Sequence, residues 1–454
     1  MSLRTRLQAA TLIVCLLPST CLAGWSVGVG KSRITPTSPT WMAGYGARDR
    51  PSEGAVHDLW AKALVLQDDA GQRSLLVTLD VCGIARELSL RIRDRVKTRH
   101  NVPIERVVLS CSHTHCGPVL GRNLLTMYDL NADQAAKVVA YEKEFEAKVN
   151  AAIDDAFKTL VPARISWETG RADFAVNRRT NKEPDVPALR DKNALEGPVD
   201  HDVPVLTVRA ADGPKVKAVV FGYACHCTVL SFYRFCGDYA GFAQIALEAR
   251  YEGAQAMFVA GCGADQNPLP RRTQELAEQY GKDLADAVGL VVDRPGRAVD
   301  GSLAAAYQEI DLKFGTPPTR EQIVADSASK TYAVASRARK LLATLDTTGK
   351  LPETYPYPIQ SWRLGGLTWV FLGGEVVVDY SLRLKRNLGP SRTWVSAYCN
   401  DVMAYIPSAR VLAEGGYEGA TAMIYYGHPG PWSAGVEAQI FDALTTMLKA
   451  SPAR

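Results

Sequence analysis

The stretch "RVVLSCSHTHCGP" (residues 106–118) joins a short apolar run to two histidines and two cysteines. The apolar run is typical of a buried β-strand. If that strand continues, Cys111, His113 and His115 share one face of it and Cys116 points to the other. A lone histidine is usually a core residue satisfied by backbone hydrogen bonds, but here two of the chain's seven histidines stand with one residue between them. Because Zn²⁺ prefers imidazole nitrogens and thiolates, the end of this strand is a candidate metal site.

A second apolar run, "FGYACHCTVLSF" (residues 221–232), contains a histidine between two cysteines. On a strand, His226 faces away from Cys225 and Cys227, so all three cannot bind one metal ion. We favour His226 as the ligand, because free cysteines are commonly small buried residues and Asp238 follows close by. Asp238 is a candidate catalytic carboxylate or a carboxylate that orients a ligand, and its alternative is a turn residue in "GDYAG".

One acid and two phenols complete the set of candidates. Glu375, in "FLGGEVVVDYSLRLK" (residues 371–385), follows an apolar strand and two glycines and precedes a helix. This position suits a metal ligand, and nearly as well an acid in the first turn of a helix, where the helix dipole favours negative charge. Tyr405 in "NDVMAYIPS" and Tyr417 in "GGYEGATAM" are, on local grounds, ordinary packing residues.

Two common kinds of catalytic loop do not occur in the sequence. "VAGCGADQNPLPR" (residues 259–271) follows an apolar strand and is rich in small residues, so its backbone can approach a ligand closely. It lacks the G-x-x-x-x-G-K-[ST] pattern of a phosphate-binding loop. The chain also has no G-x-S-x-G segment of the kind found in serine hydrolases.

Apolar strand-like runs alternate with helical patterns along the chain, which indicates an α/β fold. We predict a mixed β-sheet core flanked by helices, in a single large domain (residues 24–454) with the site at strand ends. Gly365–Gly366 between two apolar runs predicts a hairpin, and Thr319 with Gln322 three residues later predicts a helix start. The clearest predicted strands are residues 75–81, 106–112, 216–224, 254–261 and 367–374, and the predicted helices cover residues 138–157, 276–288 and 319–345.

Composition and the first residues indicate the class and location of the protein. Hydrophobic residues make up 47% of the chain and charged residues 22%, as in ordinary folded proteins. The formal charge of +4 comes without an extended basic cluster, so we expect no nucleic-acid partner.

Residues 1–23 are typical of a secretory signal peptide, which predicts a secreted or periplasmic protein. No later stretch is apolar for long enough to cross a membrane. In an oxidising compartment we expect disulfides among the remaining cysteines.

Several segments, taken in order, resemble the amidase domain of the neutral, non-lysosomal ceramidase family. They are "WMAGYGARDRPSEGAVHDLWAKALVL", "SCSHTHCGP", "FAVNRRT", "GPVDHDVPVL" with "FGYACHCT", "GADQNP", "GGEVVVDYSLRLK", "YIPS" and "YEGAT". The histidine motif and "YEGAT" are the most specific, and the resemblance covers nearly all of residues 24–454. It implies a zinc-dependent hydrolase that cleaves an amide bond of ceramide or another N-acyl lipid, with a lipid or other small-molecule substrate met in transient contact with a membrane surface.

The resemblance also implies a role for each candidate residue. His115 would be a proton carrier beside the metal, while Arg178 and Tyr417 would stabilise the oxyanion that develops on the carbonyl, a contribution that fixed hydrogen-bond donors make in acyl transfer. Asp238 is retained as a catalytic candidate. The implied ligands of a single catalytic Zn²⁺ are His113, His226, Glu375 and Tyr405.

Two features depart from the family pattern. The family's "GDVSPN"-like loop carries a serine considered important for catalysis, whereas "GADQNP" has Gln266 and Asn267 and no serine. The chain also ends soon after "YEGAT", so we expect no C-terminal immunoglobulin-like domain. Two alternatives stay open: a zinc hydrolase of esters or acylated sugars, and a noncatalytic metal- or ligand-binding protein on the same fold.

Overall fold

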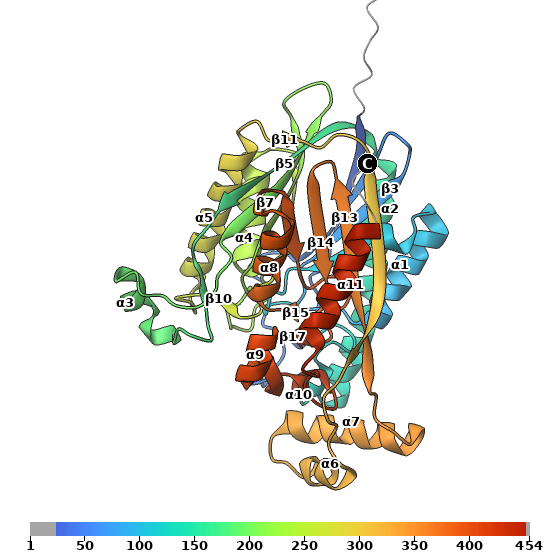
Figure 1. Cartoon of the computed structure of the whole chain (residues 1–454), viewed down its shortest axis with the longest axis vertical. Coiled ribbons are helices and arrows are strands. Elements are labelled where there is room, and N and C mark those ends of the chain that lie inside the picture. The colour runs from blue at the N-terminus through green and yellow to red at the C-terminus, as the bar shows by residue number, and fades with distance from the viewer. Residues whose placement is uncertain (1–23, 451–454) are drawn as a thin grey trace, which may run out of the picture.

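Two β-sheets pack face to face at the centre of the protein, and helices cover the outer face of each (Figure 1). The computed structural model describes residues 24–450. The predicted signal peptide lies outside these residues. The prediction of a mixed sheet flanked by helices is confirmed, with the refinement that the core contains two sheets.

The larger sheet is nine-stranded, and its neighbouring strands are antiparallel except at its two ends. There β3 and β4 are parallel, as are β8 and β9, and helices α1 (Arg86–His100) and α4 (Asp238–Arg250) make the crossovers that parallel pairs require. In sheet order the strands are β4 (Val107–Cys111), β3 (Arg73–Leu79), β2 (Trp60–Gln67), β1 (Trp25–Arg33), β5 (Val161–Arg171), β7 (Asp202–Ala210), β8 (Val216–Tyr223) and β9 (Gln255–Ala260), with β11 (Arg297–Ala298) beside β5.

Alternating side chains of the larger sheet enter two different cores. In β2, Leu64 and Leu66 pack toward the smaller sheet, whereas Ala63 and Val65 belong to the core beneath the helices. A strand buried on both faces is apolar throughout, which explains why these strands are recognisable as continuous apolar runs.

The smaller sheet consists of β12 (Leu303–Lys313), β13 (Thr354–Leu364), β14 (Leu367–Leu372) and β16 (Thr393–Ser396). The predicted hairpin is confirmed: β13 and β14 are antiparallel, with Leu364 opposite Leu367 and the two glycines between them. Tryptophans fill the space between the sheets. The rings of Trp369 and Trp394 stack with centroids 3.9 Å apart, and the Trp369 indole donates a hydrogen bond to Ser396.

Helices α2 (Ala132–Lys158), α4 and α5 (Gln274–Val292) cover the larger sheet, and α8 (Val378–Leu388) and α11 (Val436–Ala450) cover the smaller one (Figure 1). Helix α2 lies very close to β1, because β1 offers glycines there: a Cβ atom added to Gly30 would stand 2.2 Å from the carbonyl oxygen of Ala152. Within residues 24–450, no helix has both the length and the apolar character needed to cross a membrane. The shorter helices are α3 (Val186–Asp191), α9 (Ala409–Glu414) and α10 (Met423–Tyr426).

The predicted helix over residues 319–345 is in fact two helices, α6 (Arg320–Ser327) and α7 (Tyr332–Thr348). Its predicted start is confirmed, since Thr319 and Gln322 form a capping box. The break falls at residues 328–331, where the Ser329 hydroxyl accepts a hydrogen bond from the Thr331 amide. Serine and threonine side chains that bind nearby backbone compete with helical hydrogen bonds, and the polar segment between the helices does so here.

Residues 397–400 join the two ends of the larger sheet. The Ala397 amide donates to the carbonyl of Ala260 in β9, and the Cys111 amide in β4 donates to the carbonyl of Tyr398. The Asn400 amide then donates to the Leu109 carbonyl, at 2.7 Å. The sheet is therefore curved enough for one short segment to reach both β4 and β9, and this brings the ends of β4 and β8 into one region.

The expected disulfides are not present among the described residues. All eight cysteines there are unpaired and buried. Cys225, Cys227 and Cys236 belong to the main apolar core, and burial raises the pKa of their thiols well above the ordinary value. These three cysteines are small core residues that contribute to packing and form no cross-links.

Candidate metal centre

His113 stands in a loop just beyond β4. The strand ends at Cys111, and His113 has a left-handed backbone conformation with φ of 60°. The predicted strand alternation therefore does not apply to the two histidines. His113 Nδ1 lies 2.6 Å from the carbonyl oxygen of Cys82, so this nitrogen carries the proton and Nε2 faces the site.

His226 follows β8 and lies beside the His113 loop. Thr114 and Cys227 form a parallel bridge, and the His115 amide donates to the Cys227 carbonyl at 3.2 Å. The ring of His226 has the same arrangement as that of His113, because its Nδ1 lies 2.7 Å from the Gly263 carbonyl oxygen. Two imidazoles are thus held by backbone carbonyls with both Nε2 atoms directed into one space.

Glu375 and Tyr405 reach the site from segments that follow β14 and β16 of the smaller sheet. They lie opposite each other in a short parallel ladder formed by β15 (Glu375–Val376) and β17 (Tyr405–Ile406). Glu375 Oε2 is 3.1 Å from His113 Nε2 and 3.2 Å from His226 Nε2. The Tyr405 hydroxyl oxygen is 3.3 Å from His226 Nε2. The structure therefore brings together the four predicted metal ligands.

The chemistry of this cluster fits a divalent cation. His113, His226 and Glu375 are each at most 2% exposed, and their ligand atoms lie within 4.8 Å of one another. Apart from the two histidine rings, Glu375 Oε2 has no polar partner among residues 24–450, whereas the Tyr426 hydroxyl donates to Oε1. A buried carboxylate oxygen that faces only two imidazole nitrogens is an arrangement that a bound metal ion satisfies.

Protonation in the absence of metal supports the same interpretation. Burial lowers the pKa of His113, but the Glu375 carboxylate outweighs burial and holds that pKa well above its ordinary value. Burial and the Arg178 guanidinium lower the pKa of His226 to about 4, so this ring is neutral. A proton on His113 thus balances the buried carboxylate, and a cation between the three groups would take its place.

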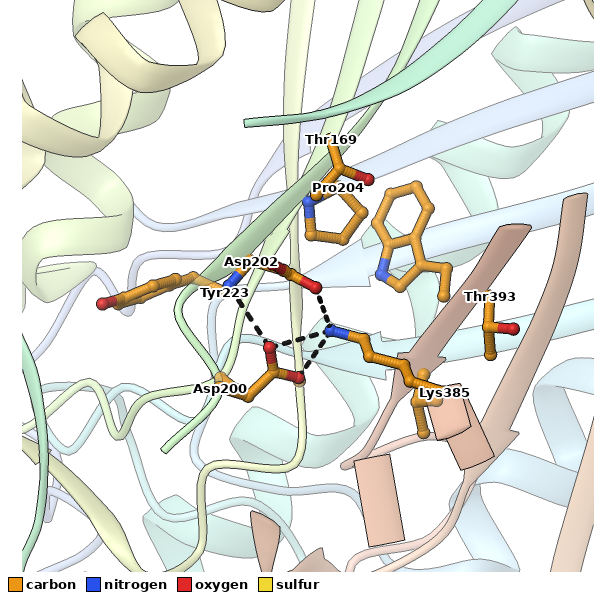
Figure 2. Close-up of a pocket in the computed structure, with 11 residues that line it drawn as sticks. Thr169, Asp200, Asp202, Pro204, Tyr223, Lys385 and Thr393 are labelled. Atoms are coloured by element: carbon orange, nitrogen blue, oxygen red, sulfur yellow. Dashed lines mark hydrogen bonds and ion pairs between the residues drawn. The ribbon is translucent and has the colours of Figure 1, made fainter. Parts of the chain in front are cut away.

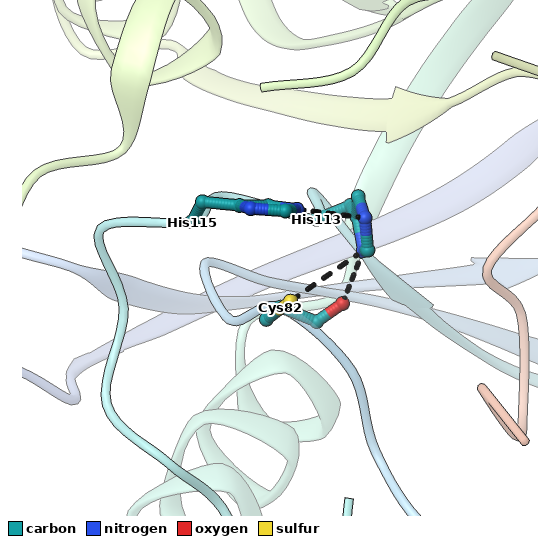
Figure 3. Close-up of side chains that lie close together, drawn as sticks. All are labelled: Cys82, His113 and His115. Atoms are coloured by element: carbon teal, nitrogen blue, oxygen red, sulfur yellow. Dashed lines mark hydrogen bonds between the residues drawn. The ribbon is translucent and has the colours of Figure 1, made fainter. Parts of the chain in front are cut away.

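A second group, Cys82 with His113 and His115, is less suited to hold a metal ion (Figure 3). The Cys82 sulfur is 3.7 Å from His113 Nδ1, but that nitrogen already faces the Cys82 carbonyl oxygen at 2.6 Å. The thiol therefore lies on the protonated side of the ring, away from the nitrogen that faces Glu375.

His115 lies against the cluster, with its Nε2 3.1 Å from His113 Nε2. Burial and the neighbouring imidazoles lower the pKa of His115 well below its ordinary value. The His115 ring packs directly against Gly44, which has φ of 95°. A Cβ added to Gly44 would stand 2.4 Å from the imidazole, so only glycine leaves room for the ring. The edge of the Tyr45 ring contacts the other side. His115 is thus a neutral imidazole adjacent to the predicted metal ligands.

Arg178 reaches the cluster from β6 (Ala175–Asn177). Its Nη2 is 3.3 Å from the Tyr405 hydroxyl, while Nε donates to Glu418 at 2.7 Å. Burial and the Glu375 carboxylate raise the pKa of Tyr405 well above its ordinary value, so the phenol is protonated without metal. Tyr417, which is 40% exposed, lies edge-on to the Tyr405 ring and marks the solvent side of the site.

Asp238 does not join this cluster. It lies at the start of α4 with φ of 57°, and its carboxylate accepts hydrogen bonds from the backbone amides of Val229, Leu230 and Tyr239. Burial raises the pKa of Asp238 to about 6. These contacts shape the turn that follows His226, which agrees with the turn alternative considered for this residue.

The loop that lacks serine has a positioning role which local sequence patterns did not indicate. The Gln266 carbonyl accepts from the His226 amide, and Asn267 Oδ1 accepts from Arg178 Nη1 at 3.3 Å. Asp265 binds the Val378 amide at the start of α8 and the Asn177 side chain. Residues Gln266–Pro268 form β10, which pairs with β6. The loop therefore aligns the histidine, the arginine and the helix that follows Glu375.

A buried ion pair anchors α8 to the larger sheet (Figure 2). Lys385 Nζ donates to Asp200 at 2.7 Å and to Asp202 at 2.7 Å, and Ser381 donates to Asp200 at 2.6 Å. Because α8 begins three residues after Glu375, these contacts limit movement of the helix relative to the histidine-bearing sheet.

The fold and the site define an α/β protein with a buried two-histidine, one-carboxylate centre at the ends of its strands. A sequence model described as "Neutral/alkaline non-lysosomal ceramidase, N-terminal" matches residues 25–267, more than half of the chain. The chain belongs to this family. The match includes His113, His115, Arg178 and His226, whereas Glu375, Tyr405 and Tyr417 lie beyond it.

Individual relatives agree with this assignment. The chain is 24% identical to the neutral ceramidase of Pseudomonas aeruginosa over 93% of its length and 72% of that protein. It is 28% identical to neutral ceramidase B of Dictyostelium discoideum, but over only 53% of this chain and 34% of that protein. The crystal structure of the Pseudomonas aeruginosa neutral ceramidase superposes with a TM-score of 0.73 at 19% identity, covering 95% of this chain and 76% of that one, which shows a shared fold.

Proposed function

We propose that this protein is a zinc-dependent amidase that hydrolyses an N-acyl lipid. The observation that carries the proposal is the meeting of Glu375 Oε2 with His113 Nε2 and His226 Nε2 at 3.1 and 3.2 Å. Two histidines and one glutamate with an open position are a donor set of catalytic zinc sites. Membership in a ceramidase family supports an amide as the scissile group.

The ligands would be His113, His226 and Glu375, with Tyr405 beside His226. When bound, the zinc ion supplies a water molecule of lowered pKa and polarises the substrate carbonyl. Glu375 is oriented by the Tyr426 hydroxyl, and both histidines by backbone carbonyls, so the three donors are fixed before substrate arrives.

The neighbouring side chains supply the remaining functions of an amidase. His115 Nε2 lies 3.1 Å from His113 Nε2, so this ring is placed to take a proton from the attacking water and to return it to the leaving amine. Arg178 donates from Nε to Glu418, and its Nη2 lies beside the Tyr405 hydroxyl. These contacts fix the positively charged guanidinium next to the proposed metal ligands. Arg178 and Tyr417 then stabilise the negative oxygen of the tetrahedral intermediate.

A mainly apolar pocket that Tyr426 links to Glu375 supports an acyl chain as part of the substrate. The cavity, of about 500 Å³, is lined by Leu125, Tyr128, Leu130, Ala135, Tyr332 and Tyr426, and its polar wall residues are Arg122, Thr126, Ser336 and Lys340. Tyr426 connects this cavity to the site, because its hydroxyl donates to Glu375. Burial of methylene groups in such a cavity favours binding by roughly 0.8 kcal/mol each.

The test uses purified mature protein whose metal content is measured before assay. Ceramide, N-acyl amino acids, N-acylethanolamines and simple esters of the same acyl chain are compared, with a Glu375→Gln variant as control. Amide turnover that requires zinc and is lost in the variant is the expected result. Activity confined to esters would favour the esterase alternative, and full zinc with no turnover of any substrate would favour a noncatalytic binding protein.

We also propose that residues 1–23 direct export and that the mature protein meets its lipid substrate in transient contact with a membrane surface. The pattern of a positive start, a short apolar core and a small-residue end supports export. N-terminal sequencing of protein recovered from the periplasm or medium tests it, and an intact Met1 in the recovered protein would contradict it.

A further inference from the structure

A second pocket opens beside Arg178 and Tyr417 and is strongly polar. Its volume is about 500 Å³, and both Arg178 and Tyr417 line it. Since Arg178 Nη2 is 3.3 Å from the Tyr405 hydroxyl, a group bound in this pocket lies within one side chain of the candidate metal ligands. The charged residues in its wall are Arg178, Arg179, Lys182, Arg271, Glu183 and Glu418.

These charges do not cancel within the pocket. Four cations face two carboxylates. Glu418 is shared between Arg178 at 2.7 Å and Arg179 at 2.5 Å, and Glu183 lies 2.8 Å from Arg271. Lys182 is exposed and, within residues 24–450, makes no ion pair. An excess of positive charge in a concave site attracts an anionic group.

The two pockets reach the cluster through different residues and differ in their lining. The apolar pocket reaches Glu375 through Tyr426, whereas the basic pocket reaches Tyr405 through Arg178. An acyl chain in the first pocket would contact Leu125, Leu130 and Tyr332, whereas an amine half beside Arg178 would meet paired charges and the unpaired Lys182.

We propose that the amine-side half of the substrate carries a carboxylate, as in an N-acyl amino acid, and that the basic pocket binds this group. The inference rests on the proposed amidase function and names its substrate class. Hydrolysis adds the hydroxyl group of water to the carbonyl carbon, breaks the C–N bond and delivers a proton to the amine nitrogen. The products are a fatty acid, from the apolar pocket, and an amino acid, from the basic one.

A sphingoid amine fits the basic pocket poorly. It carries a second long apolar chain, which the charged wall would not bury favourably, and its amine becomes a cation on release. Lys182, Arg271 and Arg178 would repel that cation. A carboxylate, in contrast, accepts charge-assisted hydrogen bonds from these side chains.

The test compares N-lauroylglycine with N-lauroylethanolamine, which share an acyl chain and differ in the charge of the amine half. Lys182→Glu reverses one exposed charge of the pocket, and Lys192→Glu, an exposed position outside the pocket, is the matched control. We expect a higher kcat/KM for N-lauroylglycine, reduced about tenfold by Lys182→Glu at low salt. We expect a smaller effect of Lys182→Glu on N-lauroylethanolamine, which lacks the carboxylate, and wild-type turnover of both substrates in Lys192→Glu.

Calorimetric binding of N-lauroylglycine to the metal-free protein gives a second measurement that does not depend on turnover. A weaker Kd in Lys182→Glu, and not in Lys192→Glu, supports the pocket assignment. Equal kcat/KM for the two amides, or a preference for ceramide, overturns it while leaving the amidase proposal intact. Hydrolysis of neither amide nor ceramide by zinc-loaded protein overturns both.

Discussion

Glu375 and Tyr405 are paired residues of one parallel ladder, although 30 positions separate them in the sequence. The Glu375 amide donates to the Ala404 carbonyl at 2.8 Å, so the spacing of the acid and the phenol is set by backbone hydrogen bonds. The histidines are fixed in a similar way, through carbonyls of Cys82 and Gly263. Main-chain contacts therefore position all four proposed ligands.

Removing either proposed histidine ligand should abolish metal binding. In His113→Ala and His226→Ala, the carboxylate of Glu375 loses one of two nitrogen neighbours, and we expect zinc content and amidase activity to be lost together. Elemental analysis by mass spectrometry measures the metal. His201→Ala is the control, because that ring contacts the Ala175 carbonyl and lies outside the cluster. Stoichiometric zinc in both ligand variants would contradict the assignment.

Arg178 should affect turnover and leave the metal in place. Arg178→Ala removes the guanidinium beside Tyr405, and loss of one oxyanion donor typically lowers kcat about a hundred- to a thousandfold. Metal analysis and steady-state kinetics on the same preparation separate the two effects. Arg410→Ala serves as control, since Arg410 pairs with Glu414 and Asp379. An unchanged kcat in Arg178→Ala would remove this residue from the mechanism.

Metal affinity should rise with pH near neutrality. The Glu375 carboxylate outweighs burial and holds the pKa of His113 well above its ordinary value, so zinc must displace a proton there. Affinity then increases up to about tenfold per pH unit until that pKa is passed. His226, with its pKa lowered to about 4, adds no further proton release above pH 6. Competition with a chromophoric chelator measures the slope, and a flat profile between pH 6 and 7 would show that His113 is neutral without metal.

Gly30 tests the close contact between β1 and α2. A methyl group there would stand 2.2 Å from the Ala152 carbonyl oxygen, so the strand and the helix must separate. Overpacking of this kind costs roughly 1–3 kcal/mol, and we expect Gly30→Ala to lower the free energy of unfolding by this amount in denaturant titration. Gly213→Ala, where no atom lies within 4 Å of the added group, should change it by less than about 0.5 kcal/mol. Equal stabilities of the two variants would mean that the contact can relax.

Local patterns predicted the parts of the site that stand at strand ends. His113 and His226 each follow an apolar strand, and Glu375 follows a strand and two glycines, so their positions were visible in the sequence. The pairing of strands into two sheets was not, because both sheets consist of similar apolar runs. The roles of Asn267 and Glu418 were also missed, since each depends on a contact with Arg178 from a distant segment.

Other errors came from rules that the three-dimensional context overrides. Strand alternation predicts the direction of the His113 side chain only if the strand continues, but β4 ends at Cys111 and His113 has a left-handed backbone conformation. The compartment alone predicts disulfides, but the eight cysteines of residues 24–450 are buried and unpaired, and six of them belong to one apolar core. The helix predicted over residues 319–345 was broken by side-chain to backbone bonding at Ser329.

The segment that joins β4 and β9 has a consequence for biosynthesis. Until residues 397–400 leave the ribosome, both outer strands of the large sheet have open hydrogen-bonding edges, which are prone to pair with other chains. Glu375 and Tyr405 come equally late, so a nascent chain that already holds both histidines has neither its acid partner nor its edge cover. Chains truncated before residue 397 should therefore aggregate, and a chaperone would be needed most during synthesis of the last quarter of the protein.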